Sequence, residues 1–420
     1  MSDTEQSFTL SVPEGDIDLL KKKLELTRFP DELGGAGWDY GVPLADVQRL
    51  VVRWKEHFNW RDAEAKINKI PQFMRDIEVE GFGSLNIHYV HQKSEVKNAV
   101  PLLFLHGWPG HFLEVQKLLP ILTAASPDHP SFHVVAPSLP GYGFSEAPAK
   151  PGFCGAQYAK VANKLMIALG YKEYVVQGGD WGSFIARTLA HMYGHKSVKA
   201  WHTNFTPIRQ PPSLRTHPRL FFQHLFTPYT DAERAGLKRM QWFNEKGRGY
   251  FFEQSTQPQT LGYSLADSPA GLLAWIYEKL VVWTDQYPWD DDEGKFPIPH
   301  PCWSLIVNLV LTWISIYWFS RAGPTASTRI YYEVTASKEY AKFAWSSIPC
   351  GLSFFPQELV AVPRTWARQV GNVVFESGHG SGGHFAAHER PVELAADIRA
   401  MFGKGGPAFG VVSERIGYDE

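Results

Sequence analysis

The segment GGDWG (178–182) carries the strongest chemical signal in this sequence. An apolar run typical of a buried strand precedes Asp180, and a helical pattern follows it. This is the context of the nucleophile elbow G-x-S-x-G, a strained strand-to-helix turn whose glycines leave room around the nucleophile. Here an aspartate stands in place of the serine. The alternative is an ordinary turn whose aspartate caps a helix, so the choice depends on the rest of the chain.

An aspartate at the elbow selects the kind of carbon that the site attacks. A serine that attacked a saturated carbon would form an ether, which water does not cleave. A carboxylate that attacks a saturated carbon forms an ester, which a second step can hydrolyse. We therefore expect Asp180 to be a covalent nucleophile. Its substrate should carry a saturated carbon with a leaving group, as an epoxide or an alkyl halide does.

A second glycine-rich segment, HGWPG (106–110), directly follows the apolar run VPLLFL. In hydrolases with a nucleophile elbow, one backbone N–H from this loop and one from the residue after the nucleophile form the oxyanion hole. Here these residues are Trp108 and Trp181. A turn with an apolar tryptophan is the alternative, but the order of strand, loop and later elbow favours the catalytic interpretation.

The base and its supporting acid should lie late in the chain, because triads on this fold run in the order nucleophile, acid, histidine. His384 follows two glycines just before the last helical pattern, and we prefer it to His379 as the base. We expect His388 to lie inside a helix, with a surface or capping role. Glu358 follows a strand-like segment and is the expected acid, with Glu376 as its rival.

An epoxide also requires an acid that donates to its ring oxygen. A tyrosine from the segment between the elbow and His384 could supply this hydrogen bond. The chain has 17 tyrosines, so most of them must be structural. The residues alone leave five candidates open: Tyr250, Tyr263, Tyr277, Tyr331 and Tyr332.

Strand and helix patterns alternate from about residue 76, beginning with an antiparallel pair (IEVEG and LNIHYVHQ). This alternation predicts an α/β fold with a mainly parallel sheet covered by helices on both faces. A helical insertion interrupts the strands and should cover their carboxyl ends, where such sheets bind ligands. The predicted division is an N-terminal extension at 1–75, a first part of the core at 76–207, a helical lid at 208–345 and a second part of the core at 346–420.

One uncharged run, Cys302 to Ser320, approaches the length of a membrane span. It contains polar residues such as Asn308 and Thr312 and has no Lys/Arg cluster at both ends. We therefore expect a buried lid helix that lines an apolar pocket. The chain starts with a polar, charged segment that does not resemble a signal peptide.

The composition of the whole chain does not point to a charged partner. Lys and Arg total 41 against 43 Asp and Glu, for a net charge of -2, so neither nucleic acid nor an anionic membrane is indicated. Aromatic residues make up 14%, which suits an apolar pocket. Cys154, Cys302 and Cys350 are widely spaced and form no metal-binding motif, so we expect no metal, no cofactor and a reducing compartment. A soluble, cytoplasmic protein is the resulting expectation.

Together these motifs resemble those of the microsomal-type epoxide hydrolases, a family with the α/β-hydrolase fold. The resemblance rests on HGWPG (106–110), GGDWGS (178–183), FPQEL (355–359) and GGHFAAHERP (382–391). It also covers the N-terminal region, which is similar to the family's wrapping extension.

The resemblance extends into the predicted lid. A tyrosine followed by a T-x-P-x-T-x-G run implies that Tyr250 activates the oxirane oxygen, and RIYYE (329–333) implies Tyr331 as the second such residue. Mammalian members of the family carry an N-terminal membrane anchor; we expect none here, because the chain looks more like the soluble fungal or bacterial forms. Gln257 replaces a Lys-like position, and the acid Glu358 is an aspartate in some relatives. The family often forms dimers, so a homodimer is possible.

The sequence thus predicts an epoxide hydrolase that converts a small apolar epoxide and water into a vicinal diol. A haloalkane dehalogenase is the first alternative, because it shares the fold and an Asp-Trp pair. A ligand-binding protein without catalysis is the second, although such a protein has no need of Asp180, Glu358 and His384 together.

Overall fold

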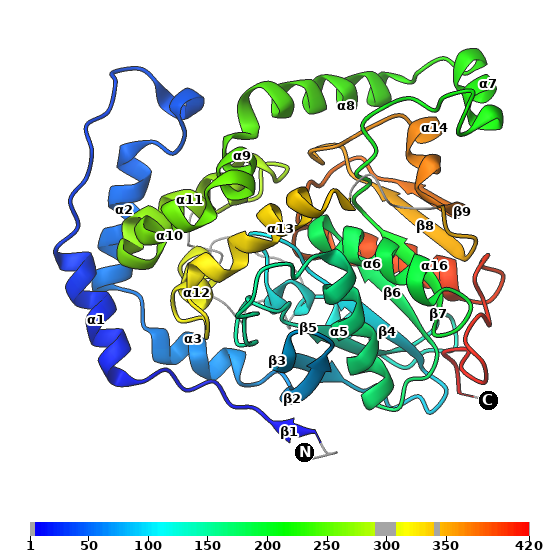
Figure 1. Ribbon diagram of the computed structural model, residues 1–420, viewed down its shortest axis with the longest axis horizontal. Helices are drawn as coiled ribbons and strands as arrows, with labels where there is room; N and C mark the ends of the chain where they lie inside the picture. Colours follow the sequence, from blue (N-terminus) through cyan, green and yellow to red (C-terminus); the bar gives the residue numbers. More distant parts are fainter. Residues whose placement is uncertain (1–4, 290–307, 340–344, 420) are drawn as a thin grey trace.

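The computed structural model describes residues 5–289, 308–339 and 345–419, and a single sheet runs through them (Figure 1). Its order is β1-β2-β3-β5-β4-β6-β7-β8-β9. The strands are β1 Gln6–Ser7, β2 Gln72–Val79, β3 Gly83–Gln92, β4 Val100–Leu105, β5 Phe132–Pro137, β6 Tyr174–Gly178, β7 Val198–Thr203, β8 Pro349–Phe354 and β9 Asn372–Gly378.

The sheet is antiparallel at one edge and parallel through its centre. β1, β2, β3 and β5 pair antiparallel in that sequence, whereas every pairing between β5 and β9 is parallel. The predicted opening pair and the mainly parallel sheet are both confirmed. β2 begins at Gln72, five residues before the predicted Ile77, because the register with β3 continues to Val90.

Helices cover both faces of the sheet, as the sequence predicted. Successive apolar residues of β4 enter opposite layers: Leu103 and Leu105 belong to one buried cluster, and Leu102 and Phe104 to the other. The core helices are η2 Phe112–Val115, α4 Leu119–Leu122, α5 Gly155–Ala168, α6 Asp180–Tyr193, α14 Arg364–Ala367, η6 Arg368–Val370, α15 Ala386–Glu389 and α16 Pro391–Phe402. α5 and α6 contact one face, and α4 and α16 the other.

Between β7 and β8 the described residues are mostly helical, and these helices lie above and to the left of the sheet in Figure 1. They are α7 Pro218–Phe226, α8 Asp231–Trp242, η3 Phe243–Gly247, α9 Gly249–Thr256, α10 Pro258–Asp267, α11 Pro269–Val282, α12 Leu309–Trp318, η4 Pro324–Thr328 and α13 Arg329–Ser337. We refer to this set as the lid helices. Among the described residues, no helix is long and apolar enough to span a membrane.

The N-terminal segment connects the lid helices to the sheet. It contains α1 Glu14–Glu25, η1 Gly37–Tyr40, α2 Leu44–Glu56 and α3 Trp60–Ile67. α1 and α2 contact α11, α3 contacts α12, and β1 joins the edge of the sheet beside β2. Polar contacts support this packing, because Arg53 Nε donates to Asn308 Oδ1 at 2.7 Å. In Figure 1 this segment, in blue, runs along the left side of the molecule beside the lid helices.

Candidate active site

Asp180 occupies a strained turn between β6 and α6. Its φ of 48° lies in the left-handed region, which non-glycine residues rarely adopt. Glycines make the turn possible, because a Cβ on Gly178 would lie 2.3 Å from the carbonyl oxygen of Gly182. A Cβ on Gly182 would lie 2.0 Å from the carbonyl oxygen of Leu105. The elbow interpretation is therefore favoured over a simple helix cap, since a capping aspartate requires neither the strain nor these glycines.

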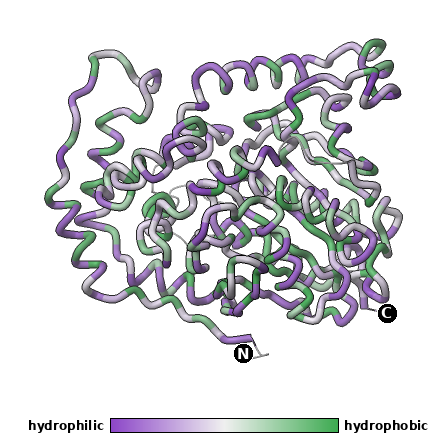
Figure 2. The backbone as a smooth tube through the Cα atoms, viewed as in Figure 1, coloured by the Kyte–Doolittle hydropathy of each residue, from purple (hydrophilic) through white to green (hydrophobic). Residues whose placement is uncertain are grey.

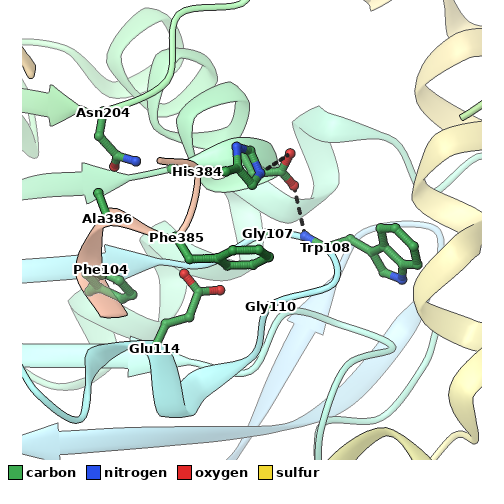
Figure 3. Close-up of a pocket in the computed structure, with 12 residues that line it drawn as sticks. Phe104, Gly107, Trp108, Gly110, Glu114, Asn204, His384, Phe385 and Ala386 are labelled. Atoms are coloured by element: carbon green, nitrogen blue, oxygen red, sulfur yellow. Dashed lines mark hydrogen bonds and ion pairs between the residues drawn. The ribbon is translucent and has the colours of Figure 1, made fainter. Parts of the chain in front are cut away.

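Two groups from other elements hold the Asp180 carboxylate (Figure 3). The backbone N–H of Trp108, in the loop after β4, donates to Oδ1 at 2.8 Å. The Nε2 atom of His384 lies 3.4 Å from Oδ2. Trp181 follows in the first turn of α6, as predicted, and its role as the second backbone donor stays a prediction.

Glu358 and Trp283 fix the orientation of His384. The Nδ1 atom lies 2.7 Å from Glu358 Oε1, so the other ring nitrogen faces Asp180. The backbone N–H of His384 donates to the carbonyl oxygen of Trp283, just after α11, and the two rings pack edge to face. Burial alone would lower the pKa of this imidazole, but the Glu358 and Asp180 carboxylates outweigh it and raise the pKa to about 10.

The rival residues lie in other networks. Glu376 accepts two hydrogen bonds from Arg368, at 2.7 and 2.8 Å. His379 pairs with Asp397 at 2.6 Å. The expectation of a surface or capping role for His388 is wrong, because this side chain is buried beside Tyr287 and Lys117. The apolar face of α15 turns His388 into the interior, which a linear sequence around a four-residue helix does not reveal.

Tyr250 and Tyr331 contact each other and line the same cavity as Asp180. The Tyr250 ring stacks on the Trp108 ring with 5.3 Å between their centroids. The Tyr331 ring packs edge-on against the Tyr250 ring, with 5.8 Å between centroids. Tyr331 also packs against the Trp181 indole. Burial raises the pKa of Tyr331 well above its usual value, so its hydroxyl stays protonated and can donate.

The other three tyrosines lie elsewhere. Tyr263 is 72% exposed, and Tyr332 is also exposed. Tyr277 is buried, but its hydroxyl donates to the carbonyl oxygen of Trp289. The structure therefore brings together with Asp180 the two tyrosines that the resemblance selected.

Asp180, Tyr250 and Tyr331 all face one cavity of about 380 Å³. Its remaining wall is mostly apolar and aromatic, which suits a small apolar ligand. It is formed by Trp181, Phe184, Phe205, Pro207, Arg209, Phe243, Arg248, Phe251, Thr335 and Leu359.

The sequence analysis missed Glu114 and Asn204, which line a second, small cavity of about 10 Å³ behind the carboxylate of Asp180 (Figure 3). This volume is close to what one water molecule requires. Burial, in the first place, raises the pKa of Glu114 to about 8. The only sequence signal was its place in the turn after HGWPG, where an acid normally faces solvent.

The predicted buried helix in 302–320 is α12, and residues 302–307 lie outside the described part of the chain. α12 is buried, but it does not contribute to the wall of the 380 Å³ cavity, contrary to expectation. It instead holds the loop 106–110 that follows β4. Trp313 Nε1 donates to the carbonyl oxygen of Pro109, and the Tyr317 hydroxyl donates to that of Gly110, both at 2.6 Å.

Comparisons with known proteins point to one family. A family described as "Epoxide hydrolase N terminus" matches residues 5–115, and the "alpha/beta hydrolase fold" family matches 100–260. Epoxide hydrolase 1 of Sus scrofa is 34% identical, over 94% of this chain and 88% of the relative.

Solved structures show the same likeness. Aspergillus niger epoxide hydrolase is 35% identical, with 94% of this chain and 95% of that one covered and a TM-score of 0.77. The juvenile hormone epoxide hydrolase of Bombyx mori is 30% identical, covers 94% and 93%, and has a TM-score of 0.80.

The sheet, the elbow and the covering helices define an α/β-hydrolase with a carboxylate at the nucleophile position. Within that class, the chain belongs to the epoxide hydrolase family and is an epoxide hydrolase. Its substrates are therefore an epoxide and water. Within the described residues, no group of three or more His, Cys, Asp or Glu side chains is arranged to hold a metal ion.

Proposed function

We propose that this chain hydrolyses a small apolar epoxide to a vicinal diol through a covalent ester on Asp180. The observation that carries the proposal is the placement of Asp180. One carboxylate oxygen accepts a backbone hydrogen bond from Trp108, and the other lies 3.4 Å from His384 Nε2. The same carboxylate faces a cavity that Tyr250 and Tyr331 also line.

In the first step, a carboxylate oxygen of Asp180 attacks a ring carbon of the epoxide. A C–O bond forms, the ring C–O bond breaks, and its electron pair moves to the ring oxygen. Tyr250 and Tyr331 hydrogen-bond to that oxygen, and one of them transfers a proton to it. The result is a hydroxyalkyl ester and a tyrosinate.

In the second step, His384 takes a proton from water, which attacks the acyl carbon of the ester. Negative charge develops on the carbonyl oxygen of the ester, where the N–H groups of Trp108 and Trp181 stabilise it. The acyl C–O bond then breaks, and the diol leaves with a proton from the imidazolium. Before this step the tyrosinate takes the proton that His384 carries in the resting enzyme, which leaves the imidazole neutral. After it, the carboxylic acid of Asp180 returns a proton to His384, so protons balance over the cycle.

The electrostatics of His384 support this order of steps. With both carboxylates charged, its pKa of about 10 keeps it protonated at neutral pH, so it is not a base in the resting enzyme. Ester formation removes the charge of Asp180 and lowers that pKa. Glu358 remains to orient the ring through Nδ1 and to stabilise the imidazolium. The base therefore becomes competent only after alkylation.

A haloalkane dehalogenase would use the same nucleophile but has no need of two tyrosines beside it. Membership of the epoxide hydrolase family favours the epoxide, and a halide-release assay distinguishes the two activities.

Three further points stay proposals: the division into extension, two core parts and lid, the cytoplasmic location, and the homodimer. Cell fractionation and light scattering of the purified protein test the last two.

The origin of the diol oxygen tests the covalent route. In a single turnover with excess enzyme in heavy-oxygen water, Asp180 should supply the new diol oxygen. The diol should then be unlabelled, and the peptide containing Asp180 should carry the label. A second turnover should bring label into the diol. Label in the first diol, with none in the peptide, would reduce Asp180 to a general base.

A further inference from the structure

The surface around α7 combines exposed apolar side chains with an unusual distribution of charge. No residue of α7 is buried, although its sequence is PRLFFQHLF. Phe222, Leu225 and Phe226 are 51%, 57% and 81% exposed, and their spacing of three and four residues places them on one face of the helix. Leu214, just before α7, is 54% exposed. A group of large apolar side chains in water marks an interaction surface.

The opposite side of α7 is attached to the core, so the apolar face is held outward. The Tyr229 hydroxyl lies 3.2 Å from His224 Nδ1 and accepts a hydrogen bond from Trp366 Nε1 of α14 at 3.0 Å. α7 and α14 are in contact at the upper right of Figure 1. Figure 2 shows hydrophobic and hydrophilic residues side by side in this part of the molecule.

The charge of this region is basic, although the whole chain is nearly neutral. Between Asp180 and Asp231 the sequence contains no Asp or Glu. Arg215 and Arg219 are exposed beside the apolar group. The first acids after α7 are engaged, because Asp231 pairs with Arg234 at 2.8 Å and Glu233 caps α8. Asp231 is 99% exposed, but Arg234 offsets its charge, so Arg215 and Arg219 leave this stretch with a net positive charge toward an anionic surface.

The same segment reaches the substrate cavity. Pro207 and Arg209 form part of the wall of the 380 Å³ cavity and are partly exposed, and the chain continues from them into α7. The wall of the cavity and the α7 surface therefore belong to one connecting segment of the chain. An apolar epoxide dissolves better in lipid than in water, so an entrance at a lipid surface would meet a higher concentration of it.

We propose that α7 and the arginines before it dock this protein reversibly on an anionic phospholipid surface. Phe222, Leu225 and Phe226 enter the boundary between headgroups and acyl chains, and Arg215 and Arg219 contact lipid phosphates. The attachment is peripheral and spans no bilayer. The advantage of docking rests on the proposed epoxide substrate, but the docking itself requires no turnover.

Vesicle sedimentation tests the proposal. The full chain should bind vesicles that contain phosphatidylserine more tightly than pure phosphatidylcholine vesicles, and high salt should weaken the binding. The Phe222→Ser/Phe226→Ser variant should bind about tenfold or more weakly. The matched control Leu26→Ser/Tyr263→Ser, which removes two exposed apolar side chains elsewhere, should bind like the wild type.

The charge component has its own pair of variants. Arg215→Glu/Arg219→Glu should abolish the preference for phosphatidylserine, whereas Lys21→Glu/Lys22→Glu on α1 should preserve it. All four variants should turn over a short, water-soluble epoxide at the wild-type rate, so loss of docking is separable from loss of activity.

Two results would overturn the proposal. One is vesicle binding by the α7 variants equal to that of the wild type. The other is a wild-type dimer that Phe222→Ser/Phe226→Ser separates, together with no vesicle binding by the wild type, because α7 would then be a subunit interface. If the wild type is active but does not bind vesicles, only the docking proposal is refuted. If it binds vesicles but turns over no epoxide, only the catalytic proposal is refuted.

Discussion

Different interactions position the residues on the two sides of the proposed substrate cavity. On the core side, backbone geometry and hydrogen bonds position Asp180, which has a φ of 48° and accepts the Trp108 N–H. On the lid side, aromatic rings position Tyr250 and Tyr331 by packing against tryptophans. Hydrogen bonds and tight turns have narrow geometric tolerance, whereas ring packing allows small shifts. The core side should therefore respond far more sharply to substitution.

The largest expected effect is on the base. His384→Gln should reduce the turnover number by about 10⁶, the scale for loss of a triad member. Ester formation should survive, because His384 is needed only for the second step. Mass spectrometry should detect an Asp180 peptide heavier by the mass of the epoxide. His191→Gln on the exposed end of α6 is the control, and full turnover by His384→Gln would exclude this histidine as the base.

A smaller effect should follow from crowding the carboxylate. A Cβ on Gly107 would lie 2.1 Å from Asp180 Oδ1, so Gly107→Ala must displace the carboxylate or the loop. The rate of ester formation should fall by about 10²–10³, the loss typical of one misplaced oxyanion donor. Gly15→Ala on α1, where a Cβ meets nothing within 4 Å, should have no effect in the same stopped-flow measurement. Equal rates in both variants would show that the core side is as tolerant as the lid.

The lid should respond least. Tyr331→Phe and Tyr250→Phe each keep the ring packing and remove one donor, so each should slow ester formation by about 10² or less while the other tyrosine still donates. The double variant should lose more than either single variant. Tyr263→Phe on the surface is the control. If the double variant alkylates at the wild-type rate, the two tyrosines are structural.

This difference also explains what the sequence could predict. Asp180, Trp108 and His384 lie at strand ends with glycines beside them, and parallel strands bring such ends together. The tyrosines had no local pattern that separated them from three others, and only the family resemblance selected them. Glu114 and the interior position of His388 escaped because burial of a polar side chain depends on contacts that form across the fold.

The sheet was predicted better than the helices around it for the same reason. Apolar strands with β-branched residues have a clear local pattern, as in YVVQG before the elbow. The place of α12 depends instead on Trp313 and Tyr317, which reach the carbonyl oxygens of Pro109 and Gly110 about two hundred residues away in the chain. Such contacts leave no periodic pattern.

The hydrogen bond to the carbonyl oxygen of Trp283 affects which lid helices can be exchanged between related enzymes. It accepts the backbone N–H of His384, and the Trp283 ring also packs against Tyr250. One residue at the end of a lid helix therefore contacts both His384 and Tyr250, which lie on opposite walls of the site. In a chimaera with a lid from a relative, the backbone N–H of His384 would donate to a carbonyl oxygen of the foreign lid. The hydrolysis rate will then depend on the position of that carbonyl oxygen. Lid exchange to change the substrate range should therefore preserve activity when the crossover lies before α11 and the native Trp283 is retained.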